Sequence, residues 1–321
     1  MDLSPTGAAG LPTTPLGLGL AAVGRPAYIT PGRDDDLGAD RSEAALEAAA
    51  HAVLDAAYAQ GVRYLDAARS YGRAEAFLSS WLAERAPSDV TVASKWGYRY
   101  TGGWRLDAPV HEVKDHGVDA LRRQLAETRG LLGDALDVYQ IHSATLDTGV
   151  LADPAVLAEL AELRAAGVTV GFTTSGPRQA ETIREGLAAE VDGVNPFGLV
   201  QATWNLLEPS AGPALAEAAE AGWVVVVKEA LANGRLAGPA TGPIAEVAAR
   251  RDATPDAVAI AAALAQPWSA VALSGAVTPS QLASNAAAVD LGLDGDDLAV
   301  LGGLAEDPEA YWQARSARAW T

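Results

Sequence analysis

Short apolar runs alternate along the chain with longer segments in which apolar residues recur at helical spacing. The runs cover residues 16–23, 63–67, 90–95, 136–142, 168–174, 199–204, 223–228 and 270–275. Segments between them, such as 42–60 and 73–85, place apolar side chains every three or four residues, which predicts amphipathic helices. Strands that alternate with helices in this way predict an α/β fold with a parallel sheet.

Residues typical of helix starts support these boundaries. Asp153 precedes Pro154, and Thr254 precedes Pro255, which in each case places an N-cap residue before a proline at the first helical position. Thr278, Pro279 and Gln281 have the spacing of a capping box. The sequence therefore predicts a helix after the last strand, beginning at residue 279.

Eight strand–helix units without an intervening linker predict a single (β/α)₈ barrel, the TIM-barrel fold, over residues 16–321, with extra C-terminal helices and an aromatic tail. A doubly wound sheet is the alternative, but it requires a Gly-x-Gly-x-x-Gly turn after the first strand, and residues 16–20 are not followed by one. Residues 1–15 are rich in Pro, Thr and Gly, so we expect a flexible N-terminus. We expect a loop over residues 24–40.

Composition narrows the possible partners. The chain has 321 residues, with 41 acidic against 23 basic ones, and its net charge of −18 argues against a nucleic-acid partner. It contains no cysteine, which excludes disulfides, thiolate metal sites and a thiol nucleophile. His111 and His116 are five residues apart and do not share a helical face, so we expect no metal there. Without a leader-like or membrane-spanning pattern, a cytoplasmic location and no membrane partner are expected.

Four side chains that can take part in proton transfer stand at predicted strand ends. Asp66 lies near the end of the second apolar run and Tyr71 follows five residues later, while Lys95 and His142 end the third and fourth runs. In a parallel barrel the active site lies at the carboxyl ends of the strands. These four residues are therefore predicted to form one catalytic site.

Several motifs, in order along the chain, resemble those of the aldo-keto reductase family. They are Asp66-Ala67-Ala68 with Tyr71-Gly72, Ser94-Lys95, Tyr139-Gln140-Ile141-His142, Gly171-Phe172-Thr173-Thr174, Val200-Gln201 with Trp204-Asn205-Leu206-Leu207, and Gly275-Ala276 with Gln281-Leu282 and Asn285. This resemblance implies an NAD(P)-dependent oxidoreductase that acts on an aldehyde, ketone or sugar.

The resemblance implies a role for each strand-end residue. Tyr71 is expected to act as the general acid, assisted by His142, which donates a hydrogen bond to the substrate oxygen or shares the proton. A free phenol has a pKa of about 10. A neighbouring ammonium favours its ionised form, so Lys95, held by Asp66, is expected to lower that pKa.

The resemblance also implies where the cofactor binds. Thr173, Thr174 and Gln201 match the positions that hold the nicotinamide carboxamide, although the family's usual Ser-Asn pair is Thr-Thr here. Lys228 stands where many members have an aromatic residue that stacks on the nicotinamide. The remaining candidates for the cofactor site are Leu231, Asn233, Gly234, Gly275, Thr278, Gln281 and Asn285.

The choice between NADP and NAD stays open in the sequence. Members that grip the 2′-phosphate of NADP use basic residues, whereas Gly275 and Gln281 at the matching positions are uncharged. Without a basic group this phosphate lacks its charge-assisted hydrogen bonds. Both cofactors remain candidates.

Aromatic residues near the strand ends are candidates for the substrate pocket. Trp96, Tyr98, Trp104 and Trp204 are predicted to line it, and the tail tryptophans Trp312 and Trp320 could fold over the barrel mouth or anchor the tail. Three alternatives stay open: an NAD-dependent aldose 1-dehydrogenase, a weakly catalytic cofactor-binding regulatory subunit, and a Schiff-base lyase that uses Lys95 or Lys228.

Overall fold

The computed structural model describes residues 1–29 and 32–321, and its core is a closed barrel of eight parallel strands. Around the barrel the strands follow the order β10, β11, β12, β3, β4, β5, β8, β9. Their bounds are β3 Leu16–Gly19, β4 Tyr64–Asp66, β5 Thr91–Trp96, β8 Leu136–Ala144, β9 Thr169–Thr174, β10 Leu199–Thr203, β11 Val224–Lys228 and β12 Val271–Ser274. The predicted (β/α)₈ barrel is confirmed.

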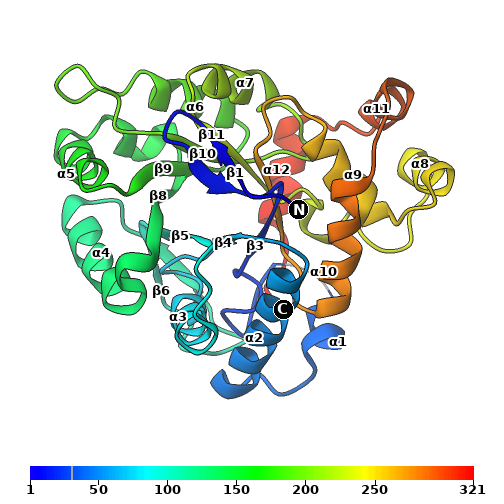
Figure 1. The fold of residues 1–321 in the computed structure, drawn as a ribbon, viewed down its shortest axis with the longest axis horizontal. Coiled ribbons are helices and arrows are strands. Elements are labelled where there is room, and N and C mark those ends of the chain that lie inside the picture. Colours follow the sequence, from blue (N-terminus) through cyan, green and yellow to red (C-terminus); the bar gives the residue numbers. More distant parts are fainter. Residues whose placement is uncertain (30–31) are drawn as a thin grey trace.

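Helices surround the strands (Figure 1). Those that alternate with the strands are α2 Glu43–Ala59, α3 Ala74–Arg85, α4 Val118–Leu132, α5 Pro154–Ala165, α6 Gln179–Leu187, α7 Gly212–Glu220, α8 Pro243–Arg251, α9 Pro255–Leu264 and α10 Pro279–Ala286. The chain ends with α11 Gly295–Gly302 and α12 Pro308–Ser316, the predicted C-terminal extra helices. Asp153 caps α5 with its side chain, and Pro154 occupies the first helical position, as predicted.

The strands are buried on both faces. Residues Val224–Val227 of β11 are each 0% exposed, as expected for a strand with barrel contents on one side and helices on the other. The helices turn one apolar face inward: α2 buries Leu46, Ala50, Val53, Leu54 and Ala57. Burial of apolar surface on both sides of the sheet is therefore the main stabilising contribution to the barrel.

The N-terminal segment forms a β-hairpin, which the sequence analysis missed. Strand β1 (Ser4–Thr6) pairs antiparallel with β2 (Leu11–Thr13), and Ala8 N–H donates a 2.7 Å hydrogen bond to Gly222 O. Leu11 is buried in a cluster with Tyr64, Val224 and other residues at the amino ends of the barrel strands. The hairpin therefore closes the barrel end opposite the catalytic mouth, where it lies across the strands in Figure 1.

Two loops contain more regular structure than predicted. A short helix, α1 (Arg33–Leu37), interrupts the predicted loop at 24–40, of which residues 30 and 31 lie outside the described part. The long connection after β5 contains a second hairpin, β6 (Tyr98–Tyr100) with β7 (Glu112–Lys114). Both segments follow strands of the barrel and rise from its carboxyl end, so they shape the mouth.

The predicted capping box of α10 forms only in part. The Thr278 side chain accepts a hydrogen bond from Gln281 N–H, as predicted. The side-chain carbonyl of Gln281, however, accepts from Val277 N–H at 3.0 Å, one residue before the cap. Gln281 is thereby fixed in one orientation.

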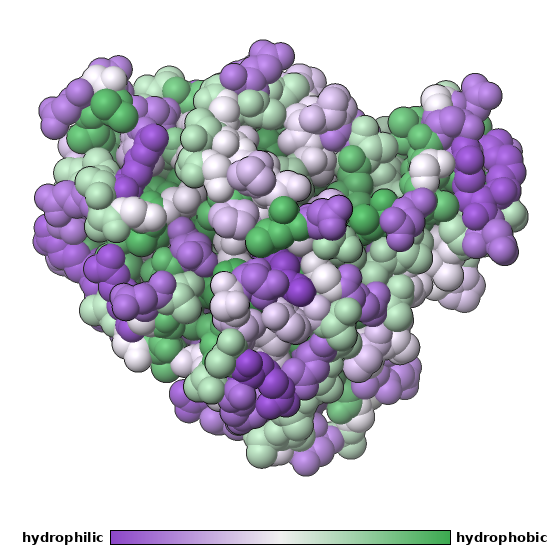
Figure 2. Space-filling model, viewed as in Figure 1, coloured by the Kyte–Doolittle hydropathy of each residue, from purple (hydrophilic) through white to green (hydrophobic). Residues whose placement is uncertain are grey.

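One corner of the molecule carries a cluster of polar side chains. On the face shown in Figure 2, hydrophilic side chains gather over the corner that α8 and α11 occupy in Figure 1. There Arg251 of α8 forms ion pairs with Asp294 and Asp297, and Arg250 also pairs with Asp297. These pairs connect the added helix α11 to the barrel. Within the described residues, no helix has both the length and the apolar character needed to cross a bilayer.

Two glycines allow the loops after β3 and β4 to meet. A Cβ atom on Gly24 would lie 2.4 Å from the Tyr71 carbonyl oxygen and 2.5 Å from the Ala74 Cβ. On the other loop, Gly72 has a φ of +62°, and its Cβ would lie 2.5 Å from the Gly24 carbonyl oxygen. This close contact sets the backbone position of Tyr71.

Replacing Gly24 by alanine is expected to lower the free energy of unfolding by about 1–3 kcal/mol, because the added methyl group overpacks the contact. Gly292→Ala is the matched control, since nothing lies within 4 Å of the Cβ there. Urea unfolding followed by tryptophan fluorescence measures both variants. Equal midpoints for the two would show that the Gly24 contact is not constrained.

Candidate functional site

The barrel register brings three of the predicted catalytic residues together. Asp66 of β4 pairs with Ala93 of β5, two residues before Lys95, and Lys95 pairs with Gln140 of β8, two residues before His142. All three therefore lie near the carboxyl ends of adjacent strands. Tyr71 comes from the loop that follows β4.

Asp66 and Lys95 form a buried ion pair beneath the barrel mouth. Lys95 Nζ donates to Asp66 Oδ2 and, at 3.0 Å, to Ala67 O. The other carboxylate oxygen, Asp66 Oδ1, accepts from Gln201 Nε2 at 3.1 Å and from Gln140 Nε2 at 3.4 Å. Burial lowers the pKa of Lys95, although the charge of Asp66 opposes this shift. Lys95 thus supports the site from below rather than facing the cavity.

Tyr71 lies above this pair as a neutral phenol. Lys95 Nζ is 4.8 Å from the centre of the Tyr71 ring, and Arg25 Cζ is 5.2 Å from it. Burial raises the pKa of Tyr71 well above its ordinary value, and the charge of Asp66 raises it further. Lys95, which the sequence places in the same site as Tyr71, predicts a lowered pKa for this phenol. The direction is reversed because Asp66 compensates the Lys95 charge and the phenol is buried.

His142 is neutral for a similar reason. Burial lowers the pKa of its imidazole well below the ordinary value, and the positive charge of Lys95 lowers it further. Its Nδ1 lies 3.3 Å from Ser70 Oγ, and its ring packs edge-on against Tyr71, with 5.4 Å between ring centres. His142 and Tyr71 are therefore adjacent groups that are both uncharged at neutral pH.

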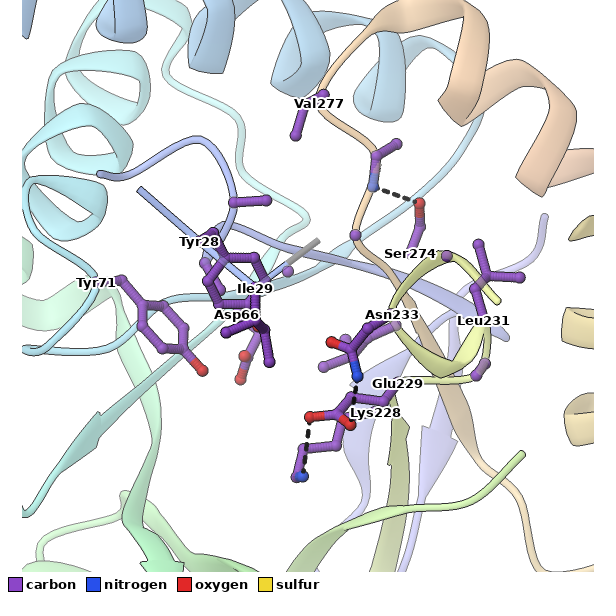
Figure 3. A pocket seen from close by; sticks show the side chains of 18 of the residues that line it. Tyr28, Ile29, Asp66, Tyr71, Lys228, Glu229, Leu231, Asn233, Ser274 and Val277 are labelled. Atoms are coloured by element: carbon purple, nitrogen blue, oxygen red, sulfur yellow. Dashed lines mark hydrogen bonds and ion pairs between the residues drawn. The ribbon is translucent and has the colours of Figure 1, made fainter. Parts of the chain in front are cut away.

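A cavity of about 560 Å³ opens above these side chains. Figure 3 shows Tyr71 and Asp66 at one side, and Ser274, Val277 and Leu231 at the other. Its volume lies in the range of cavities that hold small molecules and cofactors. The cavity extends from the proton-transfer groups across to the loop after β12.

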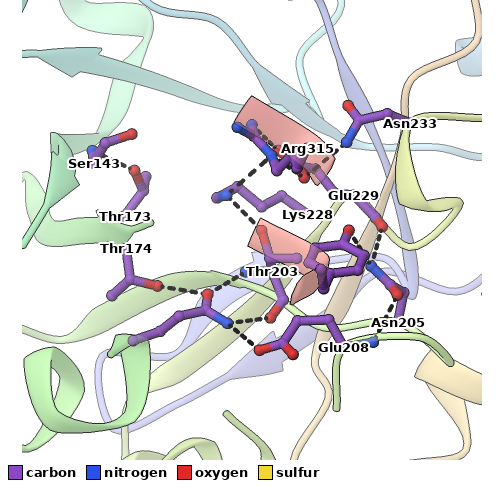
Figure 4. A network of polar contacts seen from close by, with 12 residues as sticks. Ser143, Thr173, Thr174, Thr203, Asn205, Glu208, Lys228, Glu229, Asn233 and Arg315 are labelled. Carbon is purple, nitrogen blue, oxygen red and sulfur yellow. Dashed lines mark hydrogen bonds and ion pairs between the residues drawn. The ribbon is translucent and has the colours of Figure 1, made fainter. Parts of the chain in front are cut away.

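A second polar network lies on the cavity wall at the end of β11 (Figure 4). Lys228 Nζ donates to Thr203 Oγ1 at 2.7 Å and lies 3.7 Å from Glu229 Oε1. Glu229 also forms a two-bond ion pair with Arg315 of α12 and accepts from Asn233 Nδ2. Burial lowers the pKa of Lys228 to about 8, while Glu229 opposes the shift. This network connects the C-terminal helix to the cavity.

The structure divides the predicted cofactor residues into two groups. Those that line the cavity are Thr173, Gln201, Lys228, Leu231, Asn233, Gly234, Gly275, Gln281 and Asn285. Thr174 and Thr278 do not line it. The Thr174 hydroxyl donates to Gln179 Oε1 at 3.1 Å, and Thr278 caps α10.

Three of the four aromatic residues predicted for the substrate pocket lie elsewhere. Tyr98 lines the cavity. Trp96 is 0% exposed in the core, because it follows Lys95 on β5 and points to the opposite face of the strand. Trp104 packs on Phe77 and donates to Arg41 O, and Trp204 packs on Trp268 outside the cavity.

The structure adds cavity residues that the sequence analysis missed. They are Arg25, Tyr28, Glu112, Arg315, Arg318 and other residues of the loops. Arg25 donates to Glu112 Oε2 at 2.8 Å, and its guanidinium packs on the rings of Tyr28 and Trp320. This cluster of Arg25, Glu112 and two aromatic rings is built from three separate segments of the chain, so no local sequence motif indicates it.

The two tryptophans of the aromatic tail lie in different places, one at the barrel mouth and one in the core. Trp320 lines the cavity and stacks on His111, with 4.4 Å between ring centres. Thr321 and Tyr28 exchange two backbone hydrogen bonds of 2.9 Å. Trp312 is instead buried in a cluster with α8 and α9. The last residues therefore cover the mouth, whereas α12 anchors them.

The described residues contain no group of three or more His, Cys, Asp or Glu side chains placed to hold a metal ion. His111 stacks on Trp320, and His116 Nε2 lies 2.8 Å from His142 O.

Removing Lys95 should destabilise the protein strongly, because Asp66 would remain buried without its counter-charge. Lys95→Met is expected to lower the free energy of unfolding by about 3–5 kcal/mol, and Asp66→Asn/Lys95→Met by less than the sum of the single changes. Urea unfolding measures this cycle. Arg184→Met, which breaks an exposed ion pair with Glu217, is the control and should have little effect. Strictly additive single changes would contradict the coupling.

The chain is similar in sequence to known proteins. The sequence model of the Aldo/keto reductase family matches residues 15–306. Pyridoxal 4-dehydrogenase from Microbacterium luteolum is 28% identical over 268 residues, covering 74% of this chain and 72% of that protein.

Solved structures share the fold. An aldo-keto reductase from Bacillus halodurans in its holo form superposes with a TM-score of 0.73 at 21% identity, over 96% of this chain and 97% of its own. Glycerol dehydrogenase from Gluconobacter oxydans gives a TM-score of 0.72 at 21% identity, over 94% of each chain. From the family match over nearly its whole length, the chain belongs to the Aldo/keto reductase family and is an NAD(P)-dependent oxidoreductase.

Proposed function

We propose that this protein transfers a hydride between a nicotinamide and a carbonyl or alcohol carbon, with Tyr71 as the proton donor or acceptor. The observation that carries the proposal is the shared cavity. Tyr71 and His142 face the same space as Thr173 and Gln201, above the buried pair of Asp66 and Lys95. A protonated phenol and a neutral imidazole can both hydrogen-bond to one substrate oxygen there.

The groups that line the cavity have the chemistry that a nicotinamide dinucleotide requires. Near Tyr71, the Thr173 hydroxyl and the Gln201 amide can bind a carboxamide. On the wall formed by the end of β11 and the C-terminal residues, Lys228, Arg315 and Arg318 provide positive charge for a diphosphate. The bound nicotinamide supplies or accepts the hydride, which is chemistry that no side chain of this protein can provide.

Tyr71 completes the reaction by moving one proton. In the reducing direction its hydroxyl donates a proton to the oxygen that develops negative charge, and in the oxidising direction the phenolate takes it back. The raised pKa of Tyr71 keeps the hydroxyl protonated at neutral pH, so it starts as a donor. Lys95 stabilises the phenolate that forms, because its ammonium lies only 4.8 Å from the ring centre.

His142 orients the substrate oxygen. A neutral imidazole carries one proton and one acceptor nitrogen. If Ser70 donates to Nδ1 across 3.3 Å, the proton lies on Nε2 and can be donated to the substrate. The uncharged ring then positions the oxygen without competing for the transferred proton.

Lys228 replaces the aromatic residue that many family members stack on the nicotinamide. Its ammonium is fixed by Thr203 and lies beside Glu229. A cation cannot stack as a ring does, but it can attract an anionic group of the cofactor. Lys228 is therefore assigned to electrostatic binding, and the Schiff-base role is not favoured.

We further propose an aldehyde or hemiacetal on a flat, polar ring as the substrate. Tyr28, Tyr98 and Trp320 give the cavity aromatic walls next to Tyr71, and Arg25 and Glu112 add charged groups that can bind ring substituents. Pyridoxal is the first compound to test, since the relative that is 28% identical is a pyridoxal 4-dehydrogenase. Aldoses are the second class.

Tyr71→Phe removes the transferable proton and leaves the ring in place. Turnover of pyridoxal is expected to fall by about 10²–10⁴-fold. The dissociation constant of NADH should change by less than about twofold, since the hydroxyl acts on the substrate. Initial rates at 340 nm and fluorescence titration measure the two quantities.

Tyr58→Phe is the matched control, because the Tyr58 hydroxyl bonds the exposed Asp89 far from the cavity. Equal turnover for Tyr71→Phe and Tyr58→Phe would refute the role of Tyr71. A wild-type protein that binds a cofactor but turns over neither aldehydes nor sugars would favour the regulatory-subunit alternative.

A further inference from the structure

The side of the cavity next to the loop after β12 contains two carboxylates. Asp36 of α1 and Asp256 of α9 both line the cavity, together with Gly275, Gln281 and Asn285. The resemblance placed the 2′-phosphate position of NADP at Gly275 and Gln281. Neither aspartate belongs to a motif that the sequence analysis singled out for the site.

Asp36 is held at this position by Gln281. The Gln281 side-chain carbonyl accepts from Val277 N–H at 3.0 Å, so its NH₂ group points the other way. That group donates a 2.7 Å hydrogen bond to Asp36 Oδ2, across 245 residues of sequence. A carboxylate can accept several hydrogen bonds at once, so this contact leaves capacity for a ligand hydroxyl.

Asp256 is fixed in the same manner. Asn285 Nδ2 donates to Asp256 Oδ2 at 2.7 Å, and Asn285 Oδ1 accepts from Ser274 Oγ at 2.7 Å. Both amide side chains at this side therefore direct their donors to carboxylates. Among the side chains that the structure describes at this side of the cavity, the charged groups are carboxylates, and the NH₂ group of each amide is bonded to one of them.

The cationic side chains described along the cavity bond to partners other than Asp36 and Asp256. Arg25 bonds Glu112, Lys228 bonds Thr203, Arg315 bonds Glu229, and Arg318 donates to Asn233 O. These partners belong to the mouth and to the β11 end of the cavity. Among the side chains that the structure describes, the positive charge is thus separated from the Asp36 side.

From this geometry we infer that Asp36 selects NAD over NADP by accepting a hydrogen bond from the adenosine ribose. This inference rests on the proposed function, because it requires a nicotinamide dinucleotide in the cavity. A ribose 2′-hydroxyl is a donor that a carboxylate can bind, as acidic residues do in other dinucleotide sites. A 2′-phosphate carries about two negative charges and is repelled by Asp36 and Asp256.

Cofactor titrations of the full-length protein test the inference. Energy transfer from tryptophan to NADH or NADPH reports binding, since Trp320 lines the cavity. Wild-type protein is expected to bind NADH at least about tenfold more tightly than NADPH. Asp36→Asn keeps the shape and an acceptor for Gln281, and is expected to bind NADPH about tenfold more tightly than wild type, with NADH unchanged or weaker.

Asp35→Asn is the matched control. It removes the same charge from the neighbouring residue, whose side chain does not line the cavity. It should leave the preference between the two cofactors unchanged. Wild-type preference for NADPH, or an equal effect of Asp36→Asn and Asp35→Asn, would overturn the role of Asp36 while leaving the oxidoreductase proposal intact. Binding of neither cofactor would overturn both.

Discussion

The buried ion pair between Asp66 and Lys95 organises the site, because each of the other polar groups is placed relative to it. Gln140 and Gln201 from two further strands donate to the free carboxylate oxygen, and Ala67 O accepts from the ammonium. Four strands of the barrel therefore converge on one compensated charge pair. Removing either residue would leave the other charge buried without its partner, which lowers the stability of the fold.

This compensation determines the protonation of the groups above it. A lysine without a counter-charge would favour the phenolate of Tyr71. Because Lys95 is paired with Asp66, burial is instead the largest influence on the pKa of Tyr71. Burial raises the pKa of Tyr71 and lowers the pKa of His142, so both are neutral. The site thus holds a phenol ready to donate and an imidazole that can orient the substrate, with a cation near enough to stabilise the phenolate when it forms.

The sequence predicted the barrel and the strand-end residues because both follow from local patterns and from strand register. It could not predict contacts between distant segments, such as Glu229 with Arg315 or Gln281 with Asp36. It also gave the wrong direction for the pKa of Tyr71, since that depends on burial. The outward direction of Trp96 follows from its neighbour Lys95 only once the barrel interior is known.

The most direct test of this account is the pH dependence of a single turnover with saturating NADH and an aldehyde, measured between about pH 5.5 and 7.5. This range lies below the pKa of about 8 of Lys228. The rate of NADH oxidation should be constant. Burial raises the pKa of Tyr71 well above this range and lowers the pKa of His142, so Tyr71 stays protonated and His142 stays neutral throughout it. A rate that titrates within this range would show that one of the two groups ionises there, and would contradict the dry, charge-compensated site.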